Sequence, residues 1–142
     1  MGQDAKPDFS GKWNLDIAKS DFAQAPAPLS IVLAIEHKEP NIKVSSTQTT
    51  QQGVVSNVRN LTTDGKENTN TMRAMGTDQD IKSTTNWDGR KLVTALKVDF
   101  QGMATDIQDT WELSADGQVL TVARDIKTSQ GNFAQKNVFN KQ

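Results

Sequence analysis

The sequence predicts an all-β protein that folds as a single antiparallel up-and-down β-barrel of eight to ten strands. Polar and apolar residues alternate with a period of two from Phe9 to the end of the chain, which is typical of half-buried antiparallel strands. Dipeptides that favour tight turns interrupt this alternation, among them Asp64-Gly65, Asp88-Gly89 and Asp116-Gly117. An open sheet of so many short strands would leave exposed edges, so a closed barrel is favoured over the alternative, a two-sheet sandwich.

The alternation and the turn signals together give ten strands. They are expected at about 9–17, 29–37, 42–50, 54–63, 66–75, 78–87, 90–100, 103–115, 118–129 and 132–140. The segment at about 19–30 contains Pro26 and Pro28 and breaks the alternation, so it is expected to be a loop. Residues 1–8 are expected to form an extended or disordered N-terminus, and residues 9–142 the barrel domain. One domain agrees with a length of 142 residues.

Composition and charge exclude several classes of function. The 16 Lys and Arg are scattered and the net charge is -1, so no nucleic-acid partner is expected. No apolar run approaches the roughly 18 residues that span a bilayer, so no membrane insertion is expected. The chain has no cysteine, and its one histidine, His37, has no second ligand at metal-binding spacing, so no metal is expected. Only 35% of residues are hydrophobic, which indicates an interior that is partly polar or partly hollow.

Catalytic motifs are missing from the sequence. It contains no nucleophile elbow, phosphate-binding loop or HExxH motif. Asp109 beside a cation would be a poor general base, because the cation favours the ionised carboxylate. The sequence therefore predicts neither an enzyme nor a cofactor.

Counting outward from assumed two-residue turns gives the strand register and the face that points inward. Around Asp116-Gly117 the count pairs Leu113 with Leu120, Trp111 with Val122, and Asp109 with Arg124. Continuing through the other turns predicts a polar inward row formed by Arg59, Asn70, Ser83, Thr94, Asp109, Arg124 and Asn137. Apolar residues flank this row: Leu92, Trp111, Val122 and Phe139 on one side and Leu96, Ile107 and Ile126 on the other. Trp13, Phe100 and Phe133 share the inward parity.

An inward guanidinium is costly unless it is paired, and Asp109 is the partner expected for Arg124. Two interpretations remain open. In the first, Asp109, Arg124 and Asn137 form a structural network. In the second, Arg59 and Arg124 exceed Asp109 by one charge inside an apolar cavity, which suits a lipophilic ligand that bears a carboxylate.

The second interpretation predicts non-enzymatic binding of a small lipophilic, anionic ligand inside the barrel. The expected ligand-binding residues are Arg124, Asp109, Asn137, Arg59, Asn70, Ser83, Thr94, Trp111 and Phe139. The alternative is a dry-cored barrel that serves as a structural or protein-interaction module, and the third is an isomerase or cyclase.

Two segments carry a family resemblance. FSGKW, residues 9–13, places Gly-x-Trp at the start of the first strand and resembles the opening signature of lipocalins and their calycin relatives, which include fatty-acid-binding proteins. RKLVTALKV, residues 90–98, is similar to a strand of the fatty-acid-binding proteins. The resemblance implies that Trp13 packs at the closed barrel end beneath Arg124, or else that Arg124 holds a ligand carboxylate.

The chain departs from the fatty-acid-binding pattern in two places. It has no tyrosine and therefore lacks the family's final Arg-x-Tyr. The segment 19–30 is too short for the family's two-helix lid. Residues 3–7 look like the start of a mature exported protein behind an added Met-Gly, so a periplasmic or secreted location is expected. The whole chain also resembles small exported bacterial lipocalin-like domains, and this resemblance implies a bacterial source.

Overall fold

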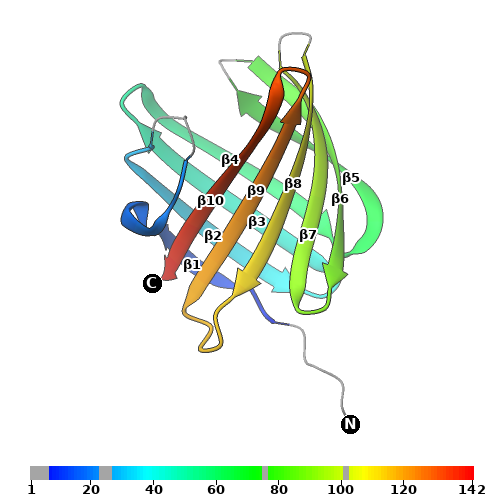
Figure 1. Cartoon of the computed structure of the whole chain (residues 1–142). Helices are drawn as coiled ribbons and strands as arrows, with labels where there is room; N and C mark the ends of the chain where they lie inside the picture. Colours follow the sequence, from blue (N-terminus) through cyan, green and yellow to red (C-terminus); the bar gives the residue numbers. More distant parts are fainter. Residues whose placement is uncertain (1–6, 23–26, 75–76, 101–102) are drawn as a thin grey trace.

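Ten antiparallel strands form one sheet that curls into a nearly closed up-and-down barrel (Figure 1). The computed structural model describes residues 7–22, 27–74, 77–100 and 103–142. The strands are β1 (Gly11–Leu15), β2 (Ser30–Lys38), β3 (Asn41–Thr50), β4 (Gly53–Thr62), β5 (Asp64–Ala74), β6 (Thr77–Asp88), β7 (Lys91–Phe100), β8 (Met103–Leu113), β9 (Val119–Thr128) and β10 (Gly131–Lys141). A short 3-10 helix, η1 (Ile17–Lys19), follows β1. The predicted fold class is confirmed.

The order of strands around the barrel is β4-β3-β2-β1-β10-β9-β8-β7-β6-β5. Apart from β4 and β5, consecutive strands are therefore paired with each other. The first strand, β1, also pairs with the last, β10. No helix in the described ranges has the length and apolar character of a membrane span.

The barrel closes between β4 and β5 through side chains. Along the described residues of these strands there is no backbone ladder. Instead the Asn70 amide accepts from the backbone N–H of Asn60 at 2.9 Å and donates to its carbonyl at 3.1 Å. The amide oxygen of Asn68 likewise accepts from the backbone N–H of Thr62 at 2.9 Å. Two asparagine side chains thus take the place of a missing strand partner, and we call this line the β4–β5 seam.

The interior contains two apolar clusters. The larger one includes Phe9, Trp13, Leu33, Ile35, Ile42, Val44, Leu61, Leu92, Trp111, Leu120, Val122 and Phe139. The smaller one consists of Leu96, Val98 and Ile107, with Ile81 and Ile126 packed against it. Alternation along each strand places these residues inward, as the period-two pattern predicts.

The end of the barrel at the β2–β3 and β6–β7 turns is closed by stacked rings. Phe9 stacks on His37 and Trp87, with ring centroids 5.8 and 6.1 Å apart. The backbone N–H of Phe9 donates to Nδ1 of His37 at 3.2 Å. Because Nδ1 accepts, Nε2 carries the imidazole proton and donates it to Glu39 at 2.7 Å. His37 therefore belongs to a buried cluster.

Glu39 ties this cluster together although its own side chain is 42% exposed. Its carboxylate accepts hydrogen bonds from Trp87 Nε1 at 2.6 Å and from the Thr63 hydroxyl at 3.1 Å. Burial opposes the negative charge, but the hydrogen bonds from His37, Trp87 and Thr63 outweigh it and lower the pKa of Glu39. The ionised carboxylate is thus the form that holds the closed end together.

The predicted registers are partly right. Around the β8–β9 turn, Leu113 faces Leu120 and Asp109 faces Arg124, as predicted. Across β7 and β8, Thr94 faces Asp109, also as predicted. These two hairpins fix the centre of the inward row.

Other hairpins are displaced by two residues. Arg124 faces Gln135 and not Asn137, because the β9–β10 turn is centred on Ser129-Gln130 and not on Gln130-Gly131. Moving a turn by one residue changes the pairing by two, so the inward face is kept while the partners change. By the same register, Val122 faces Asn137 and Ile126 faces Phe133.

The pairings on β5 and β6 are corrected in the same way. Thr94 faces Thr85 and not Ser83, because Gly89-Arg90 is the β6–β7 turn. Ser83 faces Asn68, where Asn70 was predicted. The predicted pair of Arg59 with Asn70 is wrong, because β4 and β5 meet at the seam, where Asn70 binds the backbone of Asn60.

In the predicted loop at 19–30, Lys19 ends η1 and Ser30 begins β2; between them the described residues form only an isolated bridge between Asp21 and Lys136. Pro26 lies outside the described residues, as does most of the predicted 1–8 terminus. Asp8 is described, and its carboxylate accepts from the backbone N–H of Ser10. Phe100 belongs to β7, but its side chain is outside what the structure describes.

Candidate functional site

A bidentate ion pair lies in the middle of the barrel wall. Asp109 on β8 and Arg124 on β9 are register partners. Arg124 Nε donates to Asp109 Oδ1 at 2.8 Å, and Nη2 donates to Oδ2 at 2.9 Å. The Asp109 side chain is 2% exposed and that of Arg124 34%. Both carboxylate oxygens are therefore used by one guanidinium.

This pairing favours the charged form of Arg124. Burial alone would lower the pKa of Arg124, but the attraction of Asp109 and the hydrogen bonds to its carboxylate outweigh burial and raise the pKa above its ordinary value. The pair is neutral as a unit and satisfies most of its own polar groups.

Beside the pair lies a cavity of about 280 Å³ inside the barrel. Strands from both halves of the chain line it, β2 to β4 on one side and β8 to β10 on the other, with the loop before β2 at its edge. The lining residues are Phe22, Pro28, Ile31, Leu33, Val44, Ser46, Gln48, Arg59, Asp109, Trp111, Val122, Arg124, Gln135, Asn137 and Phe139. The charged residues among them are two arginines and one aspartate, so the described lining carries a net charge of +1.

Arg59 is the cation that Asp109 does not neutralise. It projects inward from β4, opposite Val44 of β3, and lines the cavity. In the described part of the chain its guanidinium has no hydrogen bond and no ion pair. Burial lowers the pKa of Arg59, and repulsion by Arg124 adds to this, while the attraction of Asp109 opposes it. Arg59 is thus a partly buried cation without a hydrogen-bonded counter-ion among the described residues.

Asn137 also lines the cavity, but it makes no hydrogen bond to the ion pair and is not the register partner of Arg124 as predicted. Its Oδ1 is buried and has no hydrogen-bond partner among the described residues. Gln135 occupies the position opposite Arg124, and its amide donates to the Phe22 carbonyl at 3.2 Å. The predicted three-residue network is therefore a two-residue ion pair with an unsatisfied amide oxygen nearby.

The remaining predicted ligand-binding residues divide into two groups. Trp111 and Phe139 line the cavity and form part of its apolar wall. Thr94 is buried and bonds to the Thr85 hydroxyl at 3.0 Å, away from the cavity lining. Ser83 is buried on β6 and Asn70 belongs to the β4–β5 seam, so neither faces the cavity.

The pair of Trp13 and Arg124 implied by the family resemblance does not form. Trp13 is fully buried at the closed end, and its Nε1 donates to the Phe9 carbonyl at 3.0 Å. The cation over its ring is Lys141, 5.7 Å from the centroid, which is also its register partner on β10. Arg124 lies several residues further along β9 and is bound to Asp109, so it cannot reach Trp13.

Phe133 has the predicted inward parity but is 43% exposed, because it stands beside the β9–β10 turn at the mouth of the barrel.

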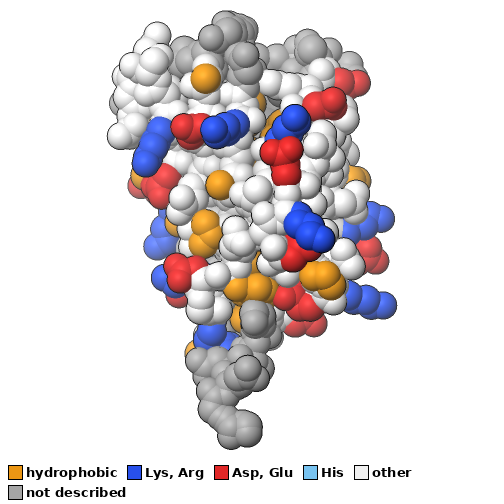
Figure 2. Space-filling model, turned by 90° about the vertical axis from the view of Figure 1, so that its right-hand side faces the viewer, with side chains coloured by type: hydrophobic (Ala, Val, Ile, Leu, Met, Phe, Trp, Pro, Cys, Tyr) orange, Lys and Arg blue, Asp and Glu red, His pale blue; other side chains and the backbone are white. Residues whose placement is uncertain are grey.

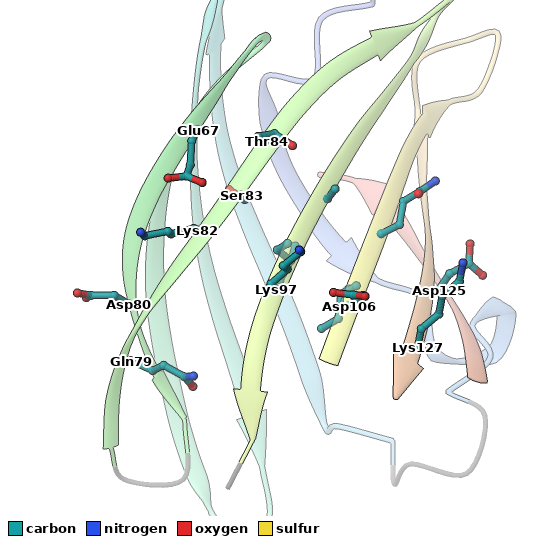
Figure 3. A pocket seen from close by; sticks show the side chains of 14 residues that line it. Glu67, Gln79, Asp80, Lys82, Ser83, Thr84, Lys97, Asp106, Asp125 and Lys127 are labelled. Carbon is teal, nitrogen blue, oxygen red and sulfur yellow. The ribbon is translucent and has the colours of Figure 1, made fainter. Parts of the chain in front are cut away.

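Two larger concavities, of about 730 and 590 Å³, lie on the outside of the barrel. The first runs over β5 to β9 and is lined by outward side chains of both charges, including Lys82, Lys97 and Asp106 (Figure 3). Figure 2 shows acidic and basic side chains interspersed over an outer face of the molecule. Both are grooves on the outer face of the twisted sheet, whereas the interior cavity contains the ion pair and Arg59, so the interior cavity is the better candidate site. Among the described residues, no three His, Asp or Glu side chains converge as metal ligands.

Sequence reasoning missed half of the cavity wall. Val44, Ser46 and Gln48 of β3 and Ile31 of β2 line it, together with Phe22 of the loop. The assumed two-residue turns connect only the strands from β4 to β10, so they do not predict the inward residues of β2 and β3. The alternating Ile31, Leu33 and Ile35 carry the signal that would have placed them.

Comparison with solved structures identifies relatives by fold. No protein-family model and no curated protein matches the sequence. The fluorescent protein UnaG is 18% identical, with a TM-score of 0.66 over 94% of this chain and 97% of that chain. Zebrafish ileal bile acid-binding protein, solved with cholic acid, is 21% identical, with a TM-score of 0.61 over 94% of this chain and 98% of that chain. The fatty-acid-binding protein of Manduca sexta is 15% identical, with a TM-score of 0.56 over 94% and 99%. The chain therefore has the ten-stranded fold of the fatty-acid-binding-protein-like calycin barrels.

Proposed function

We propose that the protein binds a small lipophilic ligand with an anionic group in the cavity of its barrel and does not transform it. One observation carries the proposal: the cavity has walls that are part apolar and part polar and a net charge of +1, and Arg59 makes no ion pair with any described residue. A partly buried cation without an ion pair gains from an anion, and the apolar part of the wall favours an anion that carries an apolar body. Two proteins of the same fold, a bile acid-binding protein and a fatty-acid-binding protein, support a ligand of this kind.

The cavity limits the size of the ligand. Its 280 Å³ is the volume of about nine water molecules at ~30 Å³ each. About ten heavy atoms of a ligand would fill it, and the rest of a larger ligand or probe would extend past Phe22 and Pro28 toward the mouth.

Fluorescence of 1-anilinonaphthalene-8-sulfonate tests the proposal. We expect the probe to brighten with the native protein and to be displaced by decanoate but not by decylammonium, which has the same tail and the opposite charge. Ser46 lines the cavity, whereas its neighbour Ser45 has the opposite parity on β3. Ser46→Trp should therefore abolish binding, and Ser45→Trp should leave it intact.

Two results would contradict the proposal. Absence of any binding by the native protein would favour the dry-cored barrel, and equal displacement by decylammonium would remove the argument from charge. Chemical change of a bound ligand would instead favour an enzyme.

A further inference from the structure

The two arginines in the cavity are not equivalent. Asp109 already gives both carboxylate oxygens to Arg124, at 2.8 and 2.9 Å, and is 2% exposed. A ligand anion that bound Arg124 would have to displace the Asp109 carboxylate or bind the guanidinium N–H groups that Asp109 does not use. Arg59 has neither a hydrogen bond nor an ion pair in the described part of the chain. An anion at Arg59 would gain a partner without breaking one.

The cavity also holds an acceptor that needs a donor. Asn137 Oδ1 is buried without a hydrogen-bond partner among the described residues. A buried acceptor left without a donor destabilises a protein, so a ligand that supplies one gains affinity. Arg59 and Asn137 line the same cavity, and a sphere of its volume is only about 8 Å across. One small molecule can therefore reach both residues.

We propose that Arg59, and not Arg124, binds the anionic group of the ligand, and that Asn137 Oδ1 accepts a hydrogen bond from a hydroxyl or N–H near that group. This inference rests on the proposed function and narrows it. The ligand class becomes small apolar acids that carry a donor close to the acid group, such as 2-hydroxy acids. Arg124 then has a structural task, which is to neutralise Asp109.

Titration calorimetry with decanoate, decanol, 2-hydroxydecanoate and 2-methoxydecanoate tests both parts. Arg59→Gln should weaken decanoate binding by about 10- to 100-fold, because a charge-assisted hydrogen bond is lost. It should leave decanol binding unchanged, which also shows that the variant is folded. Arg59→Lys should restore part of the affinity.

The neutral double variant Asp109→Asn with Arg124→Gln removes the ion pair without changing the cavity charge. It should keep decanoate affinity within about threefold. Lys127→Gln removes one positive charge from the outer face of β9 and serves as the matched control, with no expected effect. If the double variant loses decanoate as fully as Arg59→Gln, or if Arg59→Gln binds decanoate normally, the assignment to Arg59 is wrong.

The donor is tested on the native protein and on Asn137→Leu. We expect 2-hydroxydecanoate to bind about tenfold more tightly than 2-methoxydecanoate, which keeps the oxygen but cannot donate. In Asn137→Leu this difference should vanish. Equal affinities for the two acids in the native protein would overturn the role of Asn137. Failure of every ligand, decanol included, would instead overturn the proposed function itself.

Discussion

Replacing Arg124 by methionine should destabilise the barrel strongly. The change leaves the Asp109 carboxylate, which is 2% exposed, without its two hydrogen bonds of 2.8 and 2.9 Å. Removing one partner of a buried ion pair costs about 3–5 kcal/mol. Arg59 lies in the same cavity and attracts Asp109, so we expect the lower end, about 3 kcal/mol.

Urea unfolding followed by tryptophan fluorescence measures this loss. At a slope of about 2 kcal/mol/M, 3 kcal/mol moves the midpoint by about 1.5 M, and the melting temperature should fall by about 10 °C. The slope itself should not change.

A double-mutant cycle separates the ion pair from the loss of one side chain. Asp109→Leu combined with Arg124→Met removes both charges, and well-packed apolar replacements of a buried pair are often neutral or stabilising. The double variant should therefore regain most of the stability that Arg124→Met loses. Lys127→Met, on the outer face of the same strand, should stay within about 0.5 kcal/mol of the native protein. If the costs of the two single changes simply add, the pair is not coupled and the reasoning is refuted.

Three further predictions concern the closed end and the turns. In the folded protein the pKa of Glu39 lies below its ordinary value of 4.5. The stability that ionised Glu39 contributes is therefore complete at neutral pH and is lost as the pH falls from about 4.5 through the folded-state pKa. Glu39→Gln should flatten that part of a plot of unfolding midpoint against pH. Phe9→Ala should cost about 3–5 kcal/mol in urea unfolding, since Phe9 is fully buried among the stacked rings, and a cost under 1 kcal/mol would contradict its role. Gly65→Ala should destabilise more than Gly89→Ala in thermal melts, because both have positive φ but only the Gly65 methyl would come within 2.6 Å of Asn86 Oδ1.

The sequence predicts the inward face of the barrel better than it predicts contacts across it. The pair of Asp109 and Arg124 is predicted correctly because the β8–β9 turn is centred on Asp116-Gly117, as assumed. The turn is longer than two residues, with the N–H of Ser114 donating to the carbonyl of Val119, but its greater length does not change the strand register. Asn137 was misplaced because the β9–β10 turn lies one residue earlier than assumed. The period of two survives such a displacement, so Asn137 still reaches the cavity while its predicted contact is lost.

Other features have no local pattern to predict them. Phe9, His37 and Trp87 lie far apart in the sequence, and only the closed barrel brings their rings together. Whether Arg59 has a counter-ion likewise depends on whether Asp109 forms its ion pair with Arg59 or with Arg124. Register decides this, because Arg124 is the cross-strand neighbour of Asp109 and Arg59 is not.

The β4–β5 seam divides the chain into two uninterrupted meanders, β1 to β4 and β5 to β10. Along the described strands a backbone ladder joins these halves only between β1 and β10. The amides of Asn60 and Thr62 are protected from solvent exchange by single side chains, so they should be among the first strand amides to exchange with deuterium. Cleaving the chain at Thr63 would break no ladder, so separately expressed halves should reassemble into the same barrel.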